Sequence, residues 1–149
     1  MSTDQPAVSV VIPTYNRPDF LRMAVESVLD QTYEGFECLV VDDGSEEWEP
    51  LPDDPRLSVI HHETNQGVSA ARNTGIREST APLIALLDDD DRWCPEKLAR
   101  QVEFFENHPS AHAVQPEAIW YRDGNRIEQK DKHQKPDGDI FPRALERCL

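Results

Sequence analysis

Four short apolar runs along the chain predict strands. They cover residues 8–12 (VSVVI), 36–41 (FECLVV), 57–61 (LSVIH) and 83–87 (LIALL), and β-branched and aliphatic residues dominate them. Segments with helical periodicity follow the first, third and fourth runs. Because strands that alternate with helices favour a parallel sheet covered on both faces, the pattern predicts a three-layer, Rossmann-like α/β domain with a mostly parallel sheet.

Three amphipathic helices are predicted. Pro18 stands where the first begins, Asn65-Gln66-Gly67 opens the second, which runs to about residue 78, and Pro95 begins the third. In each helix, apolar residues recur at the spacing that places them on one face. The residues that we expect to face inward are Phe20, Leu21, Ala24, Val25, Val28 and Leu29, then Ala70, Ala71 and Ile76, then Leu98, Val102 and Phe105.

The character of the sequence changes after residue 111. Residues 111–129 predict two strands joined at Asp123-Gly124, a dipeptide typical of hairpin turns. Residues 128–138 are polar and rich in Lys and Asp, so we expect a loop there. Residues 139–149 predict the beginning of a helix with one apolar side, formed by Ile140, Ala144, Leu145 and Cys148.

Polar loops lie beside the predicted strand ends. They are residues 13–17 (PTYNR), 42–45 (DDGS), 65–67 (NQG) and 88–91 (DDDD). In open α/β sheets, ligands bind beyond the carboxyl ends of the strands. We therefore predict a binding site where these four loops meet.

The acidic composition narrows the possible ligands. The formal net charge is −14, with 29 acidic and 15 basic residues, which repels nucleic acid and anionic lipid. A phosphate ester would also be repelled unless a divalent cation offset the charge. The four carboxylates of residues 88–91 can hold Mg²⁺ or Mn²⁺, or they can form a solvated acidic turn, and the run alone favours neither. Its spacing excludes an EF-hand.

The other three loops each allow two interpretations. Asp42 and Asp43 can accept hydrogen bonds from a base or a ribose, or they can belong to an ordinary Asp-Gly turn. The loop at residues 13–17 offers an aromatic ring for a base and an arginine for phosphates, or it is only a loop before a helix. Arg72 lies about one turn into the second helix, where it can reach an anion or face solvent, and Asn65 can cap that helix.

We predict no disulfide, histidine metal site or membrane segment. The three cysteines are widely spaced without a CxxC motif, so free thiols in a cytosolic protein are the simplest interpretation. Pro109 separates His108 from His112, and we do not predict a metal at that pair or at His61-His62. No signal-peptide pattern and no run long enough for a transmembrane segment is present, so we expect a cytoplasmic location.

Taken in order, the motifs resemble family 2 glycosyltransferases of the GT-A fold, which are nucleotide-diphospho-sugar transferases. The resemblance rests on VSVVIPTYNRPDFLRMAVESVLDQTY, FECLVVDDGS, NQGVSAARNTGI and LIALLDDDDRWCPEKLARQV, and it extends from about Val8 to Val102. It implies a single GT-A domain over residues 1–149. Residues 1–110 would form the nucleotide-sugar-binding core, and residues 111–149 would lead toward an acceptor part.

The resemblance also implies a metal site. The DXD motif of the family falls on Asp88-Asp89-Asp90, and Asp90 would be the main ligand of Mg²⁺ or Mn²⁺, with Asp88 as the second. The middle position of the motif is usually small or neutral, so Asp89 leaves open which carboxylates touch the metal. Asp88 or Asp89 would turn toward the ribose or the sugar.

The first three motifs would form the donor pocket. Pro13, Tyr15 and Asp43 would surround the base with Asp42 beside them, and Arg72 would face the pyrophosphate. The implied donor-binding residues are Pro13, Thr14, Tyr15, Asn16, Arg17, Asp42, Asp43, Asn65, Gly67, Arg72, Asp88 and Asp89.

Members of the family are inverting enzymes. The resemblance implies that a hydroxyl of a glycan, lipid or protein acceptor attacks a nucleotide-linked sugar, mostly UDP-linked, while a carboxylate removes the proton. That base is expected beyond residue 149, so the catalytic residue is unknown, and we expect a C-terminally truncated chain that is inactive or nearly so alone. Exposed apolar surface would favour a homodimer. The alternatives are a non-catalytic nucleotide-sugar-binding fragment and a nucleotidyltransferase, although PTYNR lacks the glycines of the latter.

Overall fold

The chain forms two compact units, residues 1–109 and 110–149. The computed structural model describes residues 5–129, 135 and 137–138. The division falls one residue from the internal boundary that the sequence predicts after residue 110. Within the described residues, no helix is both long and apolar enough to cross a membrane.

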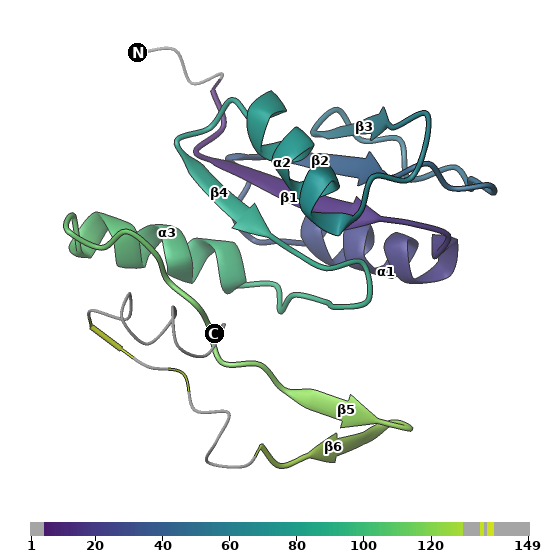
Figure 1. Ribbon diagram of the computed structural model, residues 1–149. Coiled ribbons are helices and arrows are strands. Elements are labelled where there is room, and N and C mark those ends of the chain that lie inside the picture. The colour runs from purple at the N-terminus through teal and green to yellow at the C-terminus, as the bar shows by residue number, and fades with distance from the viewer. Residues whose placement is uncertain (1–4, 130–134, 136, 139–149) are drawn as a thin grey trace. The chain divides into compact units, whose positions relative to one another are not determined.

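The first unit contains a four-stranded parallel sheet in the order β3-β2-β1-β4 (Figure 1). The strands are β1 (Val8–Thr14), β2 (Phe36–Asp42), β3 (Leu57–His61) and β4 (Leu83–Leu86). All three strand pairings are parallel. The predicted parallel sheet is therefore confirmed, and β1 and β2 each extend slightly further toward the polar loops than the sequence indicates.

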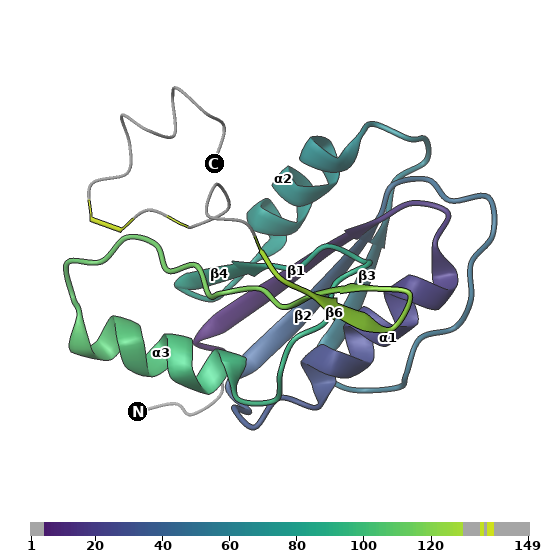
Figure 2. The same ribbon diagram turned by 90° about the horizontal axis from the view of Figure 1, so that it is seen from below.

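Helices cover both faces of this sheet, as Figures 1 and 2 show for α1 (Pro18–Leu29), α2 (Val68–Glu78) and α3 (Lys97–Asn107). The buried side chains of α1 and Leu98 of α3 join one core with Val8, Val10 and Ile12 of β1. The opposite face of β1 presents Val11 to α2. Because alternate residues of a strand point to opposite faces, the three-layer arrangement follows directly.

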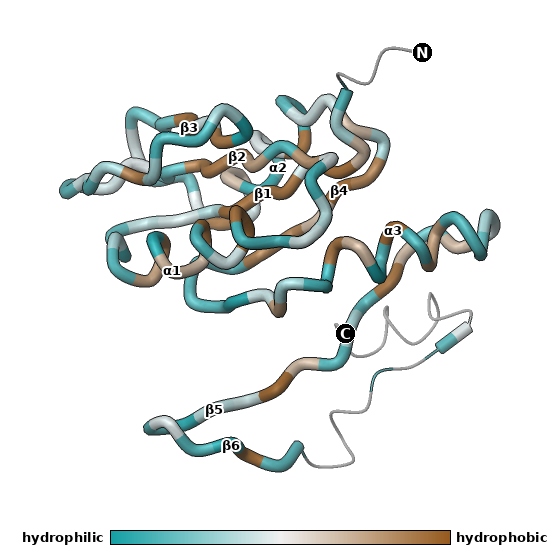
Figure 3. The backbone as a smooth tube through the Cα atoms, turned by 180° about the vertical axis from the view of Figure 1, so that it is seen from behind, coloured by the Kyte–Doolittle hydropathy of each residue, from teal (hydrophilic) through white to brown (hydrophobic). Residues whose placement is uncertain are grey.

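The core of the first unit lies where the apolar sequence runs predict it. Val10, Val11 and Ile12 of β1 and Val40 and Val41 of β2 are completely buried. These strands are among the brown, apolar segments of the tube in Figure 3. A central strand that is apolar at successive positions needs cover on both sides, and the two helical layers provide it.

Two expected core residues are on the surface instead. Phe20 is 50% exposed, because it lies in the first turn of α1, at the carboxyl edge of the sheet where the apolar strand surface ends. Ile76 is 41% exposed. The buried residues of α2 are Ala71 and Gly75, four positions apart, so the residue after Gly75 turns about 100° away from the sheet.

The second unit contains the predicted hairpin. Strands β5 (Trp120–Arg122) and β6 (Asn125–Ile127) pair in antiparallel register. Asp123 and Gly124 between them both have positive φ angles, 50° and 77°, as a type I′ turn requires. Most of the loop expected at residues 128–138 and the helix expected at residues 139–149 lie outside the described residues.

Candidate functional site

A cavity of about 400 Å³ opens beside the carboxyl ends of β1, β2 and β4, in the first unit. Loops that are far apart in the sequence meet there, as the parallel sheet requires. The residues that line the cavity are Pro13, Thr14, Tyr15, Arg17, Asp43, Asn65, Val68, Ala71, Arg72, Asp88, Asp89 and Asp90. The predicted residues Asn16, Asp42 and Gly67 are absent from this lining, whereas Val68 and Ala71 are additions.

The end of β1 is tied to the acidic loop after β4. The hydroxyl of Thr14 donates a hydrogen bond of 2.8 Å to Oδ2 of Asp89, and both side chains are buried. Arg17 places Nη1 3.4 Å from Oδ1 of Asp89 and 3.1 Å from Oδ2 of Asp90. These contacts fix the two loops on either side of the cavity.

Asn16 connects the loop after β1 to the loop after β2. The backbone amide of Asn16 donates to the hydroxyl of Ser45 at 2.8 Å. The side-chain oxygen of Asn16 accepts from the backbone amide of Glu46 at 2.9 Å. Asn16 adopts a φ of 52°, a left-handed conformation that asparagine tolerates better than most residues. Asn16 is therefore an exposed residue that holds the two loops together beside the cavity and does not line it.

The acidic run splits into distinct environments. Asp88 pairs with Nη2 of Arg72 at 2.5 Å, and Asp90 pairs with Arg17, while the Asp89 side chain is only 9% exposed. Among the described residues Asp91 has no arginine partner, and partial burial, with the charges of Asp90 and Asp88, raises its pKa. Two arginines thus neutralise part of the negative charge that the sequence places at residues 88–91.

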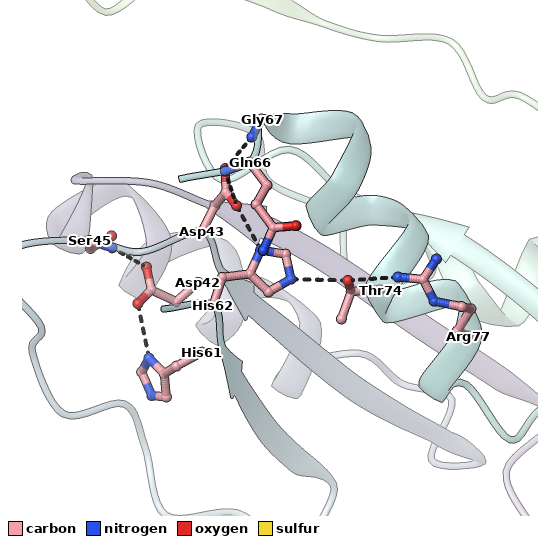
Figure 4. Close-up of polar contacts among 9 residues, drawn as sticks. All are labelled: Asp42, Asp43, Ser45, His61, His62, Gln66, Gly67, Thr74 and Arg77. Atoms are coloured by element: carbon pink, nitrogen blue, oxygen red, sulfur yellow. Dashed lines mark hydrogen bonds and ion pairs between the residues drawn. The ribbon is translucent and has the colours of Figure 1, made fainter. Parts of the chain in front are cut away.

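The two aspartates at the end of β2, Asp42 and Asp43, have different surroundings, which Figure 4 shows. Asp42 accepts hydrogen bonds from the amide of Ser45 at 3.2 Å and contacts Nδ1 of His61 at 2.9 Å, away from the cavity. Asp43, which lines the cavity, contacts Nδ1 of His62 at 2.7 Å.

Two amides at the start of α2 also bind Asp43. The amide of Gln66 donates to Oδ1 at 3.0 Å, and the amide of Gly67 donates to Oδ2 at 2.7 Å. Burial alone would raise the pKa of Asp43, but the hydrogen bonds from Gln66, His62 and Gly67 outweigh burial and hold it below its ordinary value. Asp43 is therefore an anionic acceptor in the wall of the cavity.

His62 and Thr74 support the cavity-lining Asp43 from behind, and the sequence did not indicate this role. The parallel register sets Asp42 opposite His61, so that the next pair along the two chains is Asp43 and His62. The sequence does contain a signal for this contact, because two aspartates end one predicted strand and two histidines end the next. It becomes informative only when β2 and β3 are known to be adjacent and in this register.

The cation that the resemblance implies can be tested against these side chains. No group of three or more His, Cys, Asp or Glu residues suited to a metal occurs among the described residues. Asp88 and Asp90 each use one oxygen for an arginine, which leaves their second oxygens without a partner in the described part of the chain. Mg²⁺ and Mn²⁺ commonly take one or two carboxylates together with substrate phosphates. The residues fit a cation shared with a diphosphate.

Comparison with known proteins identifies the family. The sequence profile of Glycosyl transferase family 2 matches residues 9–147. The chain belongs to glycosyl transferase family 2. It is 32% identical over 137 residues to TuaG of Bacillus subtilis (strain 168), a glycosyltransferase named for teichuronic acid biosynthesis, with 87% of this chain covered. It is 38% identical over 102 residues to WcaA of Escherichia coli (strain K12), named for colanic acid biosynthesis, with 64% of this chain covered.

Solved structures of glycosyltransferases share the fold of this family 2 chain. TarS from S. aureus in complex with UDP-GlcNAc matches 77% of the chain at 22% identity, with a TM-score of 0.61 and 38% of TarS covered. A mannosyltransferase from Pyrobaculum calidifontis in complex with GDP-Man and Mn²⁺ matches 68% at 24% identity, with a TM-score of 0.58 and 32% of that enzyme covered. The predicted GT-A fold is confirmed. The chain spans 54% of TuaG and 37% of WcaA.

Proposed function

We propose that the cavity binds a nucleoside-diphosphate sugar and that the protein transfers this sugar to an acceptor with inversion. The observation that carries the proposal is the convergence of an anionic acceptor, Asp43, two arginines and two half-exposed carboxylates on one cavity. A neutral or purely anionic ligand would not need both the acidic and the basic side chains. A ligand with a nucleobase at one end and a diphosphate at the other can use all of these side chains.

The base would lie against Tyr15 and Pro13 with its polar edge toward Asp43. Tyr15 lines the cavity and is 43% exposed, so its ring is available for stacking. Asp43 accepts hydrogen bonds only, and it is held by three donors. Together these side chains would fix the orientation of the nucleoside.

Arg72 would bind the diphosphate. Its Nη2 contacts Asp88, but its Nε is buried and has no hydrogen-bond partner among the described residues. An unpaired buried N–H group costs about 1–3 kcal/mol. A phosphate oxygen of the nucleotide sugar would recover this cost once the Arg72 side chain turns Nε toward the cavity. The guanidinium can then contact the carboxylate and the phosphate at the same time.

Asp88 and Asp90 would hold the divalent cation with the diphosphate oxygens. The cation supplies positive charge that stabilises the departing nucleoside diphosphate. Arg17 and Arg72 would keep the two carboxylates oriented toward the cavity when the donor enters. The mannosyltransferase neighbour binds GDP-Man together with Mn²⁺, which supports Mn²⁺ as the first cation to test.

The acceptor of the proposed reaction is a glycan. Two relatives are named for the biosynthesis of teichuronic acid and of colanic acid, which favours a glycan over a protein. In an inverting transfer, a base removes the proton of the acceptor hydroxyl as it attacks the sugar from the face opposite the diphosphate. We assign no residue to that base. The alternative is a protein that binds the donor without turning it over.

Two measurements on the chain separate these possibilities. The first compares UDP with UMP by isothermal titration calorimetry in Mn²⁺. We expect UDP to bind at least about tenfold more tightly, because only UDP offers two phosphates to the cation and Arg72. Equal affinities would contradict the diphosphate site. The second follows UDP release from UDP-GlcNAc, the donor bound by TarS, with glycan acceptors present. Binding with turnover supports a transferase and contradicts the non-catalytic alternative, whereas binding without turnover is the result expected both of that alternative and of a chain that is inactive alone.

A further inference from the structure

His62 occupies a buried position behind the wall of the cavity. Its side chain is 9% exposed, whereas the neighbouring His61 side chain is 52% exposed. The ring of His62 lies between Asp43, at the cavity, and Thr74, on α2, with Nδ1 2.7 Å from Asp43 and Nε2 3.0 Å from the Thr74 hydroxyl (Figure 4). His61 contacts Asp42 instead, which does not line the cavity.

The partners of His62 determine which ring nitrogen carries the proton. A carboxylate only accepts, so Nδ1 bears the hydrogen that points to Asp43. In the neutral ring, Nε2 is then an acceptor and receives the hydrogen of the Thr74 hydroxyl. That hydroxyl accepts in turn from Nη2 of Arg77 at 3.1 Å. Donors therefore run in one direction, from Arg77 through Thr74 and His62 to Asp43.

The hydrogen bonds that Asp43 accepts from the protein leave few positions on its carboxylate for a ligand. Oδ1 accepts from His62 and from the Gln66 amide, and Oδ2 accepts from the Gly67 amide. A carboxylate has about four lone-pair positions, so one position on Oδ2 remains. Because the three donors stabilise the anion, this position accepts a hydrogen and cannot donate one.

We propose that His62 is a positioning residue that keeps Asp43 an acceptor-only carboxylate and thereby selects bases with a ring N–H. This inference rests on the proposed function, since it requires the base to meet Asp43. Uracil, thymine and guanine carry a hydrogen on the ring nitrogen of their polar edge. Cytosine and adenine carry a lone pair there, which faces the lone pair of Oδ2 and is repelled. Nucleoside diphosphates of the first group are the expected ligands.

Matched substitutions separate the two hydrogen bonds of His62. In His62→Asn, the side-chain amide nitrogen takes the place of Nδ1 and can still donate to Asp43. In His62→Gln, the longer side chain places its amide near Nε2, so the contact with Thr74 is kept and the donor to Asp43 is lost. His61→Gln is the control, because His61 holds the aspartate outside the cavity. Thr74→Val tests the support from α2 without altering the histidine.

The measured quantity is the ratio of the CDP and UDP dissociation constants in Mn²⁺, with the melting temperature recorded for every variant. For the wild type we expect CDP to bind at least about tenfold more weakly than UDP. His62→Asn and His61→Gln should retain this ratio. His62→Gln should lower it several-fold, through weaker UDP binding and little change for CDP. Thr74→Val keeps the Nδ1 donor to Asp43 and should lower the ratio less, through looser placement of the His62 ring.

A purely structural histidine would give a different result. It would weaken UDP and CDP equally in His62→Gln and leave the ratio at the wild-type value, and that outcome overturns the inference. If either variant fails to fold, the other, with its retained melting temperature, decides the question. If the wild type binds neither nucleotide, the proposed function itself is wrong. If the wild type binds UDP and CDP equally, it is the base selection by Asp43 that is wrong.

Discussion

Single residues of the acidic run have distinct tasks, although their sequence is uniform. Asp89 is buried and receives the Thr14 hydroxyl, so it joins β4 to β1. Asp88 and Asp90 are half exposed and face the cavity beside the two arginines. Four identical neighbours reveal nothing about the direction of their side chains. The sequence therefore predicts a carboxylate cluster at the cavity, but the division between the buried carboxylate and the half-exposed ones comes from the structure.

We expect Asp90→Asn and Asp89→Asn to separate these tasks. Asp90→Asn should remove most of the effect of Mn²⁺ on UDP affinity and change the free energy of unfolding by less than about 0.5 kcal/mol, because its side chain is exposed. Asp89→Asn should lower the free energy of unfolding by about 1–3 kcal/mol, because a buried hydrogen bond is weakened. Urea denaturation and calorimetry measure the two quantities. A large loss of stability in Asp90→Asn would argue against its assignment to the cation.

At the scale of elements, the strands were more predictable than the inward faces of the helices. The four apolar runs coincide with β1 to β4. In β1 and β2 the signal is strong because these strands are buried along almost their whole length, whereas β3 and β4 are buried only in part. For α2 the signal is weak, because the helix contacts the sheet through Ala71 and Gly75. Apolarity therefore pointed to Ile76, whereas close approach of helix and strand selects small residues. Loop contacts such as that between Asn16 and Ser45 depend on backbone geometry that the sequence does not encode locally.

The contact between α2 and β1 can be tested at Gly75. A Cβ atom there would lie 2.3 Å from Cγ1 of the buried Val11, so α2 or the strand must move. We expect Gly75→Ala to lower the free energy of unfolding by about 1–2 kcal/mol, despite the higher helix propensity of alanine. Ile76→Ala is the matched control, and its exposed position should give a change below about 1 kcal/mol. A more stable Gly75→Ala protein in urea denaturation would contradict the close packing.

The ion pair of Asp54 and Arg56, just before β3, makes a contribution to the free energy of unfolding that depends on pH. Hydrogen bonds from the Arg56 side chain and amide lower the pKa of Asp54 to about 2, from 3.8 in an unfolded chain. The ionised form is therefore favoured in the folded state. This stabilisation is complete above about pH 5 and is lost as the pH falls through the folded-state pKa.

We expect Asp54→Asn to reduce the free energy of unfolding by about 1–2 kcal/mol at pH 7, allowing for partial solvent screening of the pair. The difference between wild type and variant should shrink steadily between pH 5 and pH 2. Urea denaturation across this range provides the measurement. A difference that stays constant with pH would show that Asp54 does not titrate in this way.

At the scale of the whole molecule, the negative charge and the ligand are in apparent conflict. A chain with a formal charge of −14 repels a diphosphate, and four aspartates line the same cavity as the arginines. The pairs Arg17–Asp90 and Arg72–Asp88 reduce this repulsion, but they do not reverse it. A bound divalent cation would turn the repulsion of the diphosphate into attraction. The proposed donor site and the proposed cation site should therefore be thermodynamically coupled, so that each ligand raises the affinity for the other.

The most direct test of this account is a titration of the chain with UDP by calorimetry, in excess Mn²⁺ and in EDTA. We expect Mn²⁺ to tighten UDP binding by at least about tenfold, and UDP to tighten Mn²⁺ binding by the same factor. Arg17 and Arg72 alone would leave a weak residual affinity in EDTA. Equal UDP affinity in Mn²⁺ and EDTA would contradict the shared site of cation and diphosphate at Asp88 and Asp90.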